Sequence, residues 1–269
     1  YPMPIASAQV KSAILLAGLQ AEGETIVREP QRSRDHTEVI IRGFGGKIAV
    51  EGLVVRLRGP QELVGQEVRI PGDISSAAFF LVAAAMIPGS DLLVKGIGCN
   101  ATRDGVIEVL RKMGAQIEVR EQRFEAGEPV ADIHVRGGKL HGVDIGPEFV
   151  ARTIDEYPIL AVAAAAAEGT TRFSDVQELR YKESDRIAAM TEGLRALGIA
   201  VDERQDGMTI QGAGRFHGGA IKSYGDHRIA MSFTIAGLLS DSGVEIDDAA
   251  CADISFPSFF DLLGEICLH

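Results

Sequence analysis

Four segments of the chain repeat the same order of polar and hydrophobic positions. In each, a polar residue precedes an apolar helix, a glycine or small-residue turn follows, and then a β-rich run; the segments begin at Ser7, Asp73, Asp155 and Asp226. An apolar helix with so little polar surface has to be covered by sheets or by other helices. The polar residue at the start is typical of a helix N-cap. The pattern therefore predicts four buried helices, and their positive ends are suited to bind anions.

A second repeat alternates with the first. Helical stretches end in Phe44-Gly45, Met113-Gly114 and Leu197-Gly198, and each glycine is followed by an alternating strand such as residues 116–119. Glycine after the last apolar residue is a usual helix stop. The unit is then strand, helix, strand, amphipathic helix, strand and hairpin strand, repeated roughly every 65 to 80 residues, as in stacked supersecondary units. We expect an α/β fold with sheets outside and helices buried in the middle.

Composition restricts the kind of ligand and its location. The formal net charge is −11, which argues against a nucleic-acid surface, because such surfaces gather basic residues. An anionic ligand would be held by a few placed Lys and Arg side chains. The apolar runs 77–87 and 158–167 are shorter than a bilayer span, so we expect no membrane partner. Cys99, Cys251 and Cys267 have neither disulfide nor metal spacing, which favours the cytoplasm and no metal site.

Cations stand at two predicted helix starts. Lys182 and Arg186 are four residues apart, so on one helix face they would repel each other unless an anion or a neighbouring carboxylate lies between them. The alternative for this run is a solvated first turn. Arg228 stands in the first turn of an apolar helix, where a cation opposes the helix dipole. We therefore expect a carboxylate or phosphate partner for Arg228.

Two aspartates and one glycine-rich stretch can also be explained by a structural role. Asp155 begins a buried helix, and an N-cap and a functional carboxylate are equally good explanations for it. Asp73 begins another helix without a nearby cation, and we interpret it as an N-cap. Residues 96–101 match a dinucleotide-binding fingerprint, with Glu118 at the expected distance. The interleaved repeats do not fit a Rossmann sheet, so we interpret residues 96–101 as a turn.

Six motifs run in order over essentially the whole chain, at residues 7–12 (SAQVKS), 33–38 (SRDHTE), 154–158 (IDEYP), 179–186 (LRYKESDR), 226–231 (DHRIAM) and 255–257 (SFP). Together they closely resemble the 5-enolpyruvylshikimate-3-phosphate (EPSP) synthase family. The first two are similar to the class II bacterial branch, which includes glyphosate-tolerant members of this glyphosate-target family. The family's lysine before the last Phe-Pro pair is absent, since Ile254 precedes Ser255.

The resemblance implies a fold and a domain organisation. The family has an inside-out α/β barrel of βαβαββ repeats in two domains, with the active site between them. Residues 1–70 would be the C-terminal part of the first domain, and residues 71–269 the second domain; Arg69-Ile70-Pro71-Gly72 fits that boundary. Further first-domain motifs of the family would precede Tyr1. We therefore expect the isolated 269-residue chain to be inactive without that segment.

The resemblance also implies roles for particular residues. The family transfers the enolpyruvyl group of phosphoenolpyruvate to the 5-hydroxyl of shikimate-3-phosphate, without a cofactor or a metal. The positions that match its shikimate-3-phosphate ligands are Ser7, Ala8, Gln9, Ser33, Arg34, Asp155 and Lys182. Those that match its phosphoenolpyruvate ligands are Gln9, Arg186 and Arg228. The catalytic proton transfers fall to Asp155, Glu183 and Lys182. The complete enzyme is expected to be a cytoplasmic monomer.

Three other functions stay open at this point. One is a UDP-N-acetylglucosamine enolpyruvyl transferase, which a UDP-sugar requirement would reveal. A second is a non-catalytic remnant that binds the ligand without turnover. A third is a dehydrogenase built on Gly96 and Gly98, which nicotinamide binding would reveal.

Overall fold

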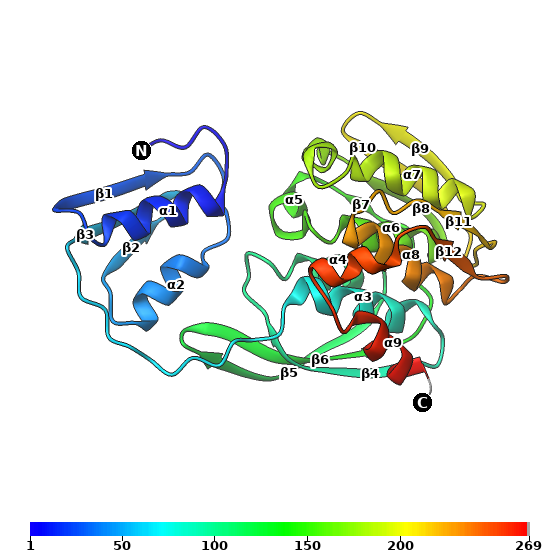
Figure 1. Ribbon diagram of the computed structural model, residues 1–269, viewed down its shortest axis with the longest axis horizontal. Helices are drawn as coiled ribbons and strands as arrows, with labels where there is room; N and C mark the ends of the chain where they lie inside the picture. The colour runs from blue at the N-terminus through cyan, green and yellow to red at the C-terminus, as the bar shows by residue number, and fades with distance from the viewer. Residues whose placement is uncertain (268–269) are drawn as a thin grey trace.

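The computed structural model describes residues 1–267, which form a small and a large body (Figure 1). The small body ends at Gly59, and an extended segment without helix or strand runs from residue 60 to residue 71. Each body has its own cluster of buried apolar side chains, one between Met3 and Leu57 and the other between Ile74 and Leu263. No helix in residues 1–267 combines the length and the apolar character needed to cross a bilayer.

The small body is one sheet with two helices. Its strands are antiparallel, in the order β1–β3–β2. The elements are α1 (Ala8–Gly18), β1 (Gly23–Arg28), α2 (His36–Gly43), β2 (Ile48–Glu51) and β3 (Val54–Gly59).

The large body surrounds its helices with three sheets, ordered β4–β6–β5, β7–β8–β10–β9 and β11–β12. The strands are β4 (Asp91–Gly98), β5 (Gln116–Glu125), β6 (Glu128–Arg136), β7 (Asp144–Ile145), β8 (Gly169–Phe173), β9 (Ala200–Arg204), β10 (Gly207–Gly212), β11 (Gly219–Ile221) and β12 (Val244–Ile246). The α-helices are α3 (Ile74–Met86), α4 (Gly105–Lys112), α5 (Pro147–Thr153), α6 (Tyr157–Ala166), α7 (Arg186–Ala196), α8 (His227–Gly237) and α9 (Phe259–Cys267). Two 3₁₀ helices complete it, η1 (Gln177–Tyr181) and η2 (Ala249–Ile254).

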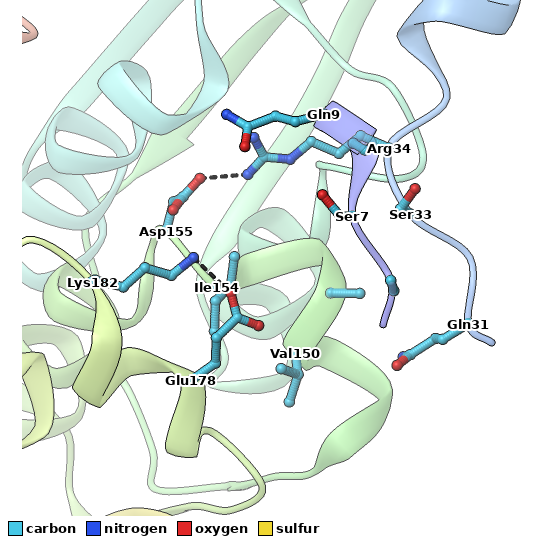
Figure 2. A pocket seen from close by; sticks show the side chains of 13 residues that line it. Ser7, Gln9, Gln31, Ser33, Arg34, Val150, Ile154, Asp155, Glu178 and Lys182 are labelled. Carbon is cyan, nitrogen blue, oxygen red and sulfur yellow. Dashed lines mark hydrogen bonds and ion pairs between the residues drawn. The ribbon is translucent and has the colours of Figure 1, made fainter. Parts of the chain in front are cut away.

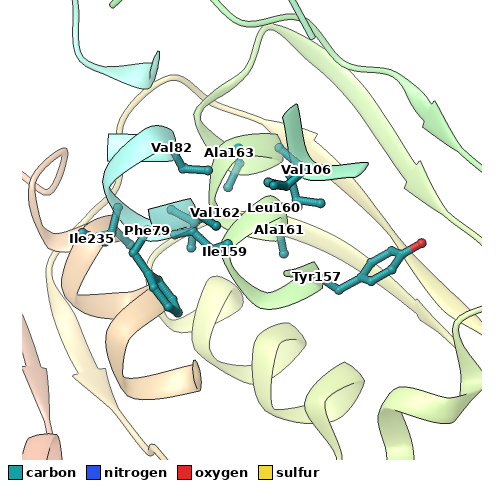
Figure 3. Packing of buried hydrophobic residues seen from close by; sticks show 14 of the residues in the cluster. Phe79, Val82, Val106, Tyr157, Ile159, Leu160, Ala161, Val162, Ala163 and Ile235 are labelled. Atoms are coloured by element: carbon teal, nitrogen blue, oxygen red, sulfur yellow. The ribbon is translucent and has the colours of Figure 1, made fainter. Parts of the chain in front are cut away.

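Three predicted apolar helices lie in the centre of the large body. Helices α3, α6 and α8 contact one another in pairs, and Figure 3 shows Phe79, Leu160 and Ile235 packed where they meet. Small residues of α6, such as Ala161 and Ala163, are fully buried and allow close approach between helices. Each large side chain buried in this way contributes roughly 1.5–3 kcal/mol. Helices inside and sheets outside confirm the inside-out α/β fold.

The repeat predicted from the sequence is also confirmed. In one complete unit, β7 pairs in parallel with β8, and β8 then joins the antiparallel hairpin β9–β10. The amphipathic helices α2, α4 and α7 end just before the predicted glycines. Gly45, Gly114 and Gly198 have φ angles of +81°, +93° and +83°, a region that side chains rarely adopt. The sequence signal therefore comes from a backbone conformation that the turn requires.

Within residues 1–267 helix α1 contacts β1 and β3 on one side, while Leu16 on the other side is 55% exposed. One expectation about a single element is wrong. Gly96 and Gly98 do not form a turn: they lie in strand β4, at a register shift between Val94 and Ile97. Gly96, with a φ of +70°, supplies the conformation that such a bulge requires.

Polar contacts join the two bodies. Asn100 donates to the Asp35 carboxylate at 2.9 Å and to Glu128 at 3.0 Å, and His36 lies 2.7 Å from the second oxygen of Glu128. The turn of the β5–β6 hairpin reaches α2, where the carbonyl of Ala126 lies against Gly43. The bodies therefore face each other mainly through hydrogen-bonding groups.

Candidate active site

A cavity of about 340 Å³ lies between the two bodies. The small body lines it from the start of α1 and from the coil before α2, and the large body lines it from the start of α6 and from the residue after η1 (Figure 2). All seven residues expected to bind shikimate-3-phosphate line it, namely Ser7, Ala8, Gln9, Ser33, Arg34, Asp155 and Lys182. Segments far apart in sequence thus form one polar wall.

Asp155 is not an N-cap, contrary to one of the two explanations offered for it. Glu156 occupies the cap position of α6, without a side-chain cap hydrogen bond. The Asp155 carboxylate instead forms an ion pair with Arg34 across the cavity (Figure 2). Burial raises the pKa of Asp155, but the charges of Arg228, Arg34 and Lys182 outweigh burial and lower it to about 2. Asp155 is therefore ionised at neutral pH.

Arg186 lies behind Asp155 and is almost completely buried. Its side chain is 1% exposed, its Nε donates to Asp226 at 2.8 Å, and its Nη2 donates to Glu183 at 2.7 Å. Among residues 1–267 its Nη1 has no hydrogen-bond partner, and it lies 4.0 Å from a carboxylate oxygen of Asp155. An unpaired guanidinium nitrogen in the interior is costly, so this atom is available to an anion.

Asp226 is the N-cap that the sequence predicted. One carboxylate oxygen accepts from the main-chain N–H of Arg228 at 2.9 Å, while Ser184 and Arg186 bond the other. Burial raises the pKa of Asp226, but the hydrogen bonds and charge of Arg186 outweigh burial and lower it. The same carboxylate thus caps α8 and orients Arg186.

Lys182 and Arg186 do not share a helix face, so the predicted like-charge pair on one helix is wrong. Helix α7 begins at Arg186, with Asp185 as its cap, whereas Lys182 follows the 3₁₀ helix η1 and bonds Glu178 at 2.8 Å. Asp185 ends the non-helical stretch because its carboxylate accepts from the main-chain N–H of Ala188. The Lys182 side chain points into the cavity as a result (Figure 2).

Arg228, for which the sequence predicted a carboxylate or phosphate partner, lies beside Asp155. Its Nη1 donates to the main-chain carbonyl oxygen of Asp155 at 3.0 Å, and its charge helps to lower the pKa of the Asp155 carboxylate. Lys182, Arg186 and Arg228 therefore surround Asp155, but of these three only Lys182 lines the cavity. Glu183 is half exposed and pairs with Arg186.

Sequence reasoning missed several neighbours of these groups. Glu178 stands four residues before Lys182, a spacing that could have indicated the pair, while Val150 and Ile154 line the cavity from α5 and its end. Glu156 is buried and accepts from Ser75, and burial raises the pKa of Glu156. Asp73 is an N-cap, as predicted, but it does have a cation neighbour, because Arg103 lies 2.9 Å away. That pair joins residues thirty apart, which spacing does not reveal.

Residues 1–267 contain no group of histidine, cysteine, aspartate and glutamate side chains suited to hold a metal ion. The ionisable groups that line the cavity are Asp155, Glu178, Lys182 and Arg34. Such groups can bind anions bidentately and move protons.

An inside-out α/β fold with a polar cavity between two bodies is typical of the class of enolpyruvyl-transferase-like proteins. The profile described as EPSP synthase (3-phosphoshikimate 1-carboxyvinyltransferase) matches residues 1–263. The chain therefore belongs to the EPSP synthase family.

Individual relatives agree with this assignment. The 3-phosphoshikimate 1-carboxyvinyltransferase of Desulfitobacterium hafniense (strain DSM 10664 / DCB-2) is 53% identical over 99% of the chain and 61% of its own length. That of Geobacter sulfurreducens is 51% identical over 100% of the chain and 63% of its own length. The structure of EPSP synthase from Acinetobacter baumannii superposes with a TM-score of 0.95 at 47% identity, over 99% of this chain and 62% of that one. The chain thus spans about three fifths of the length of these relatives.

Proposed function

We propose that the chain carries part of the active site for enolpyruvyl transfer from phosphoenolpyruvate to the 5-hydroxyl of shikimate-3-phosphate, with release of phosphate. The relatives' shared name, 3-phosphoshikimate 1-carboxyvinyltransferase, supplies the reaction. The observation that supports it best is the ionised Asp155 carboxylate, which faces a cavity lined by Arg34 and Lys182. A base surrounded by cations suits a reaction between two anionic substrates.

The proton transfers balance with the groups present. The 5-hydroxyl attacks the central carbon of phosphoenolpyruvate as its methylene gains a proton, and phosphate later leaves as the new methyl group loses one. We assign the hydroxyl proton to Asp155 and the transfers at the methylene to Glu183 and Lys182. Substrate groups that take the donors of Arg34 would make Asp155 more basic, because Arg34 is one of the charges that lower its pKa.

Two arginines are assigned to phosphoenolpyruvate, together with Gln9. The free Nη1 of Arg186 supports the assignment, because it lies 4.0 Å from Asp155 and has no other partner. Arg228 adds a second guanidinium beside the same aspartate. The planar guanidinium group of an arginine can donate to two oxygens of a carboxylate or phosphate at once. Shikimate-3-phosphate is assigned to Ser7, Ala8, Gln9, Ser33, Arg34, Asp155 and Lys182, all of which line the cavity.

Domain division, location and assembly are part of the proposal. The two separate apolar clusters support a boundary near residue 70, between the end of a first domain and a second domain. The free thiols of Cys99, Cys251 and Cys267 support a reducing compartment, the cytoplasm. We propose a monomer that binds these two small substrates and no nucleic acid, in keeping with the net charge of −11.

The test is phosphate release in a chimera, in which residues 1–269 replace the matching segment of the Geobacter sulfurreducens relative. The chimera should release phosphate when both substrates are present, and it should not accept UDP-N-acetylglucosamine in place of shikimate-3-phosphate. Calorimetric binding of shikimate-3-phosphate without turnover would favour a ligand-binding remnant instead. Turnover that requires the UDP-sugar would overturn the assigned substrate.

A further inference from the structure

The small body contains a buried cluster of three charged side chains, Lys11, Glu29 and Glu38. The Lys11 ammonium lies 3.1 Å from Oε2 of Glu29 and 2.8 Å from Oε1 of Glu38. Their side chains are 1%, 3% and 2% exposed, respectively. One lysine thus faces two glutamates in the interior, and among residues 1–267 Oε2 of Glu38 has no hydrogen-bond partner.

Fold stability alone does not account for this cluster. Moving an ion out of water costs several kcal/mol, and well-packed apolar residues in place of a buried ion pair are often equally or more stable. Stability by itself therefore gives no reason for three buried charged side chains at this place, and their other contacts show what they hold.

The cluster holds the coil that lines the cavity. Strand β1 ends at Arg28 and helix α2 begins at His36, so no regular hydrogen-bond ladder fixes the residues between them. Oε1 of Glu29 accepts from the main-chain N–H of Ser33 at 3.2 Å and also from its hydroxyl. The Lys11 ammonium also lies 3.5 Å from the carbonyl oxygen of Ser33. All three polar groups of Ser33 therefore contact the cluster.

We propose that Glu29 is a positioning residue for shikimate-3-phosphate, and that Lys11 and Glu38 serve to hold it. Lys11 takes one oxygen of Glu29, which turns the other oxygen toward Ser33. Ser33 and Arg34 then face the cavity at a fixed place. This inference rests on the function proposed above, because it requires the cavity to bind that substrate.

A matched pair of substitutions separates positioning from structural support. Glu29→Gln and Glu38→Gln each remove one buried carboxylate from Lys11, but only Glu29 touches Ser33. A glutamine at position 29 has a single terminal acceptor atom, so it cannot accept from Lys11 and Ser33 through separate oxygens. A glutamine at position 38 keeps its acceptor on Lys11 and places its amide nitrogen where the unpartnered oxygen stands.

The readouts are calorimetric binding of shikimate-3-phosphate to the chain, steady-state kinetics of the chimera and denaturant unfolding. We expect Glu29→Gln to raise the Kd and the KM for shikimate-3-phosphate about tenfold, whereas Glu38→Gln changes them less than about threefold. The kcat and the KM for phosphoenolpyruvate should stay within about twofold of the parent in both variants. Both should lower the free energy of unfolding by similar amounts.

Each result leads to a distinct conclusion. Equal effects of the two variants on the Kd would show that the cluster is only structural and would overturn the inference. Failure of the parent chain and of the parent chimera to bind shikimate-3-phosphate would overturn the proposed function itself. If Glu29→Gln does not fold, Glu29→Asp keeps the charge beside Lys11 and shortens the reach to Ser33. It should also raise the Kd, and an unchanged Kd would contradict the inference.

Discussion

Compared with the small body, the large body places its groups at the starts of helices: Asp155 precedes α6, Arg186 begins α7 and Arg228 lies in the first turn of α8. The small body places Ser33 and Arg34 on coil held by buried charges. The cavity is thus supported by helix starts on one side and by electrostatics on the other.

The largest effect on activity should come from Asp155, which lines the cavity from the large body. Asp155→Ala in the chimera should lower kcat about 10³-fold, within the range for loss of a general base, while the Kd for shikimate-3-phosphate rises far less. Phosphate release and calorimetry measure the two quantities. An unchanged kcat would show that Asp155 is not the general base.

The packing of α6 and of α1 can be compared with one leucine substitution in each helix. Leu160 is fully buried in α6, so Leu160→Ala should lower the free energy of unfolding by about 3 kcal/mol. Leu16→Ala, on the exposed side of α1, is the matched control and should change it by less than about 0.5 kcal/mol. Denaturant unfolding measures both variants. Equal losses would break the comparison between the two bodies.

The ion pair between the bodies makes stability depend on pH. Arg228, Arg34 and Lys182 outweigh burial and lower the pKa of Asp155 from 3.8 to about 2, so its stabilisation is complete above pH 4 and is lost as the pH falls through 2. Between pH 7 and pH 2 the parent should lose about 2 kcal/mol more than Asp155→Asn. Parallel pH profiles, obtained by denaturant unfolding, would contradict the depressed pKa.

Replacing Arg228, which lies beside Asp155, should reduce activity less than removing the Asp155 carboxylate. Arg228→Lys keeps the charge but loses the planar fork, so the KM for phosphoenolpyruvate in the chimera should rise about tenfold. Arg215→Lys, an exposed arginine in the same body, serves as the control and should leave this KM unchanged. If both variants behave alike, Arg228 acts only as a point charge.

The smallest effect is expected at the start of α3. Asp73 caps this helix and pairs with Arg103, but its side chain is partly exposed, so the pair contributes little. Asp73→Asn keeps a capping side chain and should cost less than about 1 kcal/mol of stability. Its kcat and KM in the chimera should stay within about twofold of the parent. A large kinetic loss with unchanged stability would place Asp73 in the site.

The sequence predicted features that depend on near neighbours. The glycine stops at residues 45, 114 and 198 and the cap at Asp226 follow from backbone conformation and hydrogen bonding within one turn. The burial of α3 and α6 follows from their composition. For α1, composition shows that the helix needs cover, but it does not show which element supplies it; within residues 1–267 only β1 and β3 do.

Contacts between distant segments were not predictable from spacing. Asp155 and Arg34 are 121 residues apart in sequence, and Lys11 and Glu29 are 18 apart. Family motifs brought Asp155 and Arg34 into one list of ligands, but they did not indicate an ion pair between them. Glu29 belongs to none of the six motifs, and only its position beside Ser33 draws attention to it. The prediction that Lys182 lies on a helix face with Arg186 was wrong because Asp185, three residues after Lys182, is the N-cap of α7.

The hydrogen bonds and ion pairs that connect the two bodies determine how strongly the bodies are held together. Neither cluster of buried apolar residues described within residues 1–267 contains side chains from both bodies, so the two could move apart without opening a hydrophobic core. Such a movement exchanges the Arg34–Asp155, Asn100–Asp35 and His36–Glu128 contacts for contacts with water. The net cost of each exchange is about 1 kcal/mol. Contacts of this kind therefore resist a change in the width of the cavity less than a shared apolar core would.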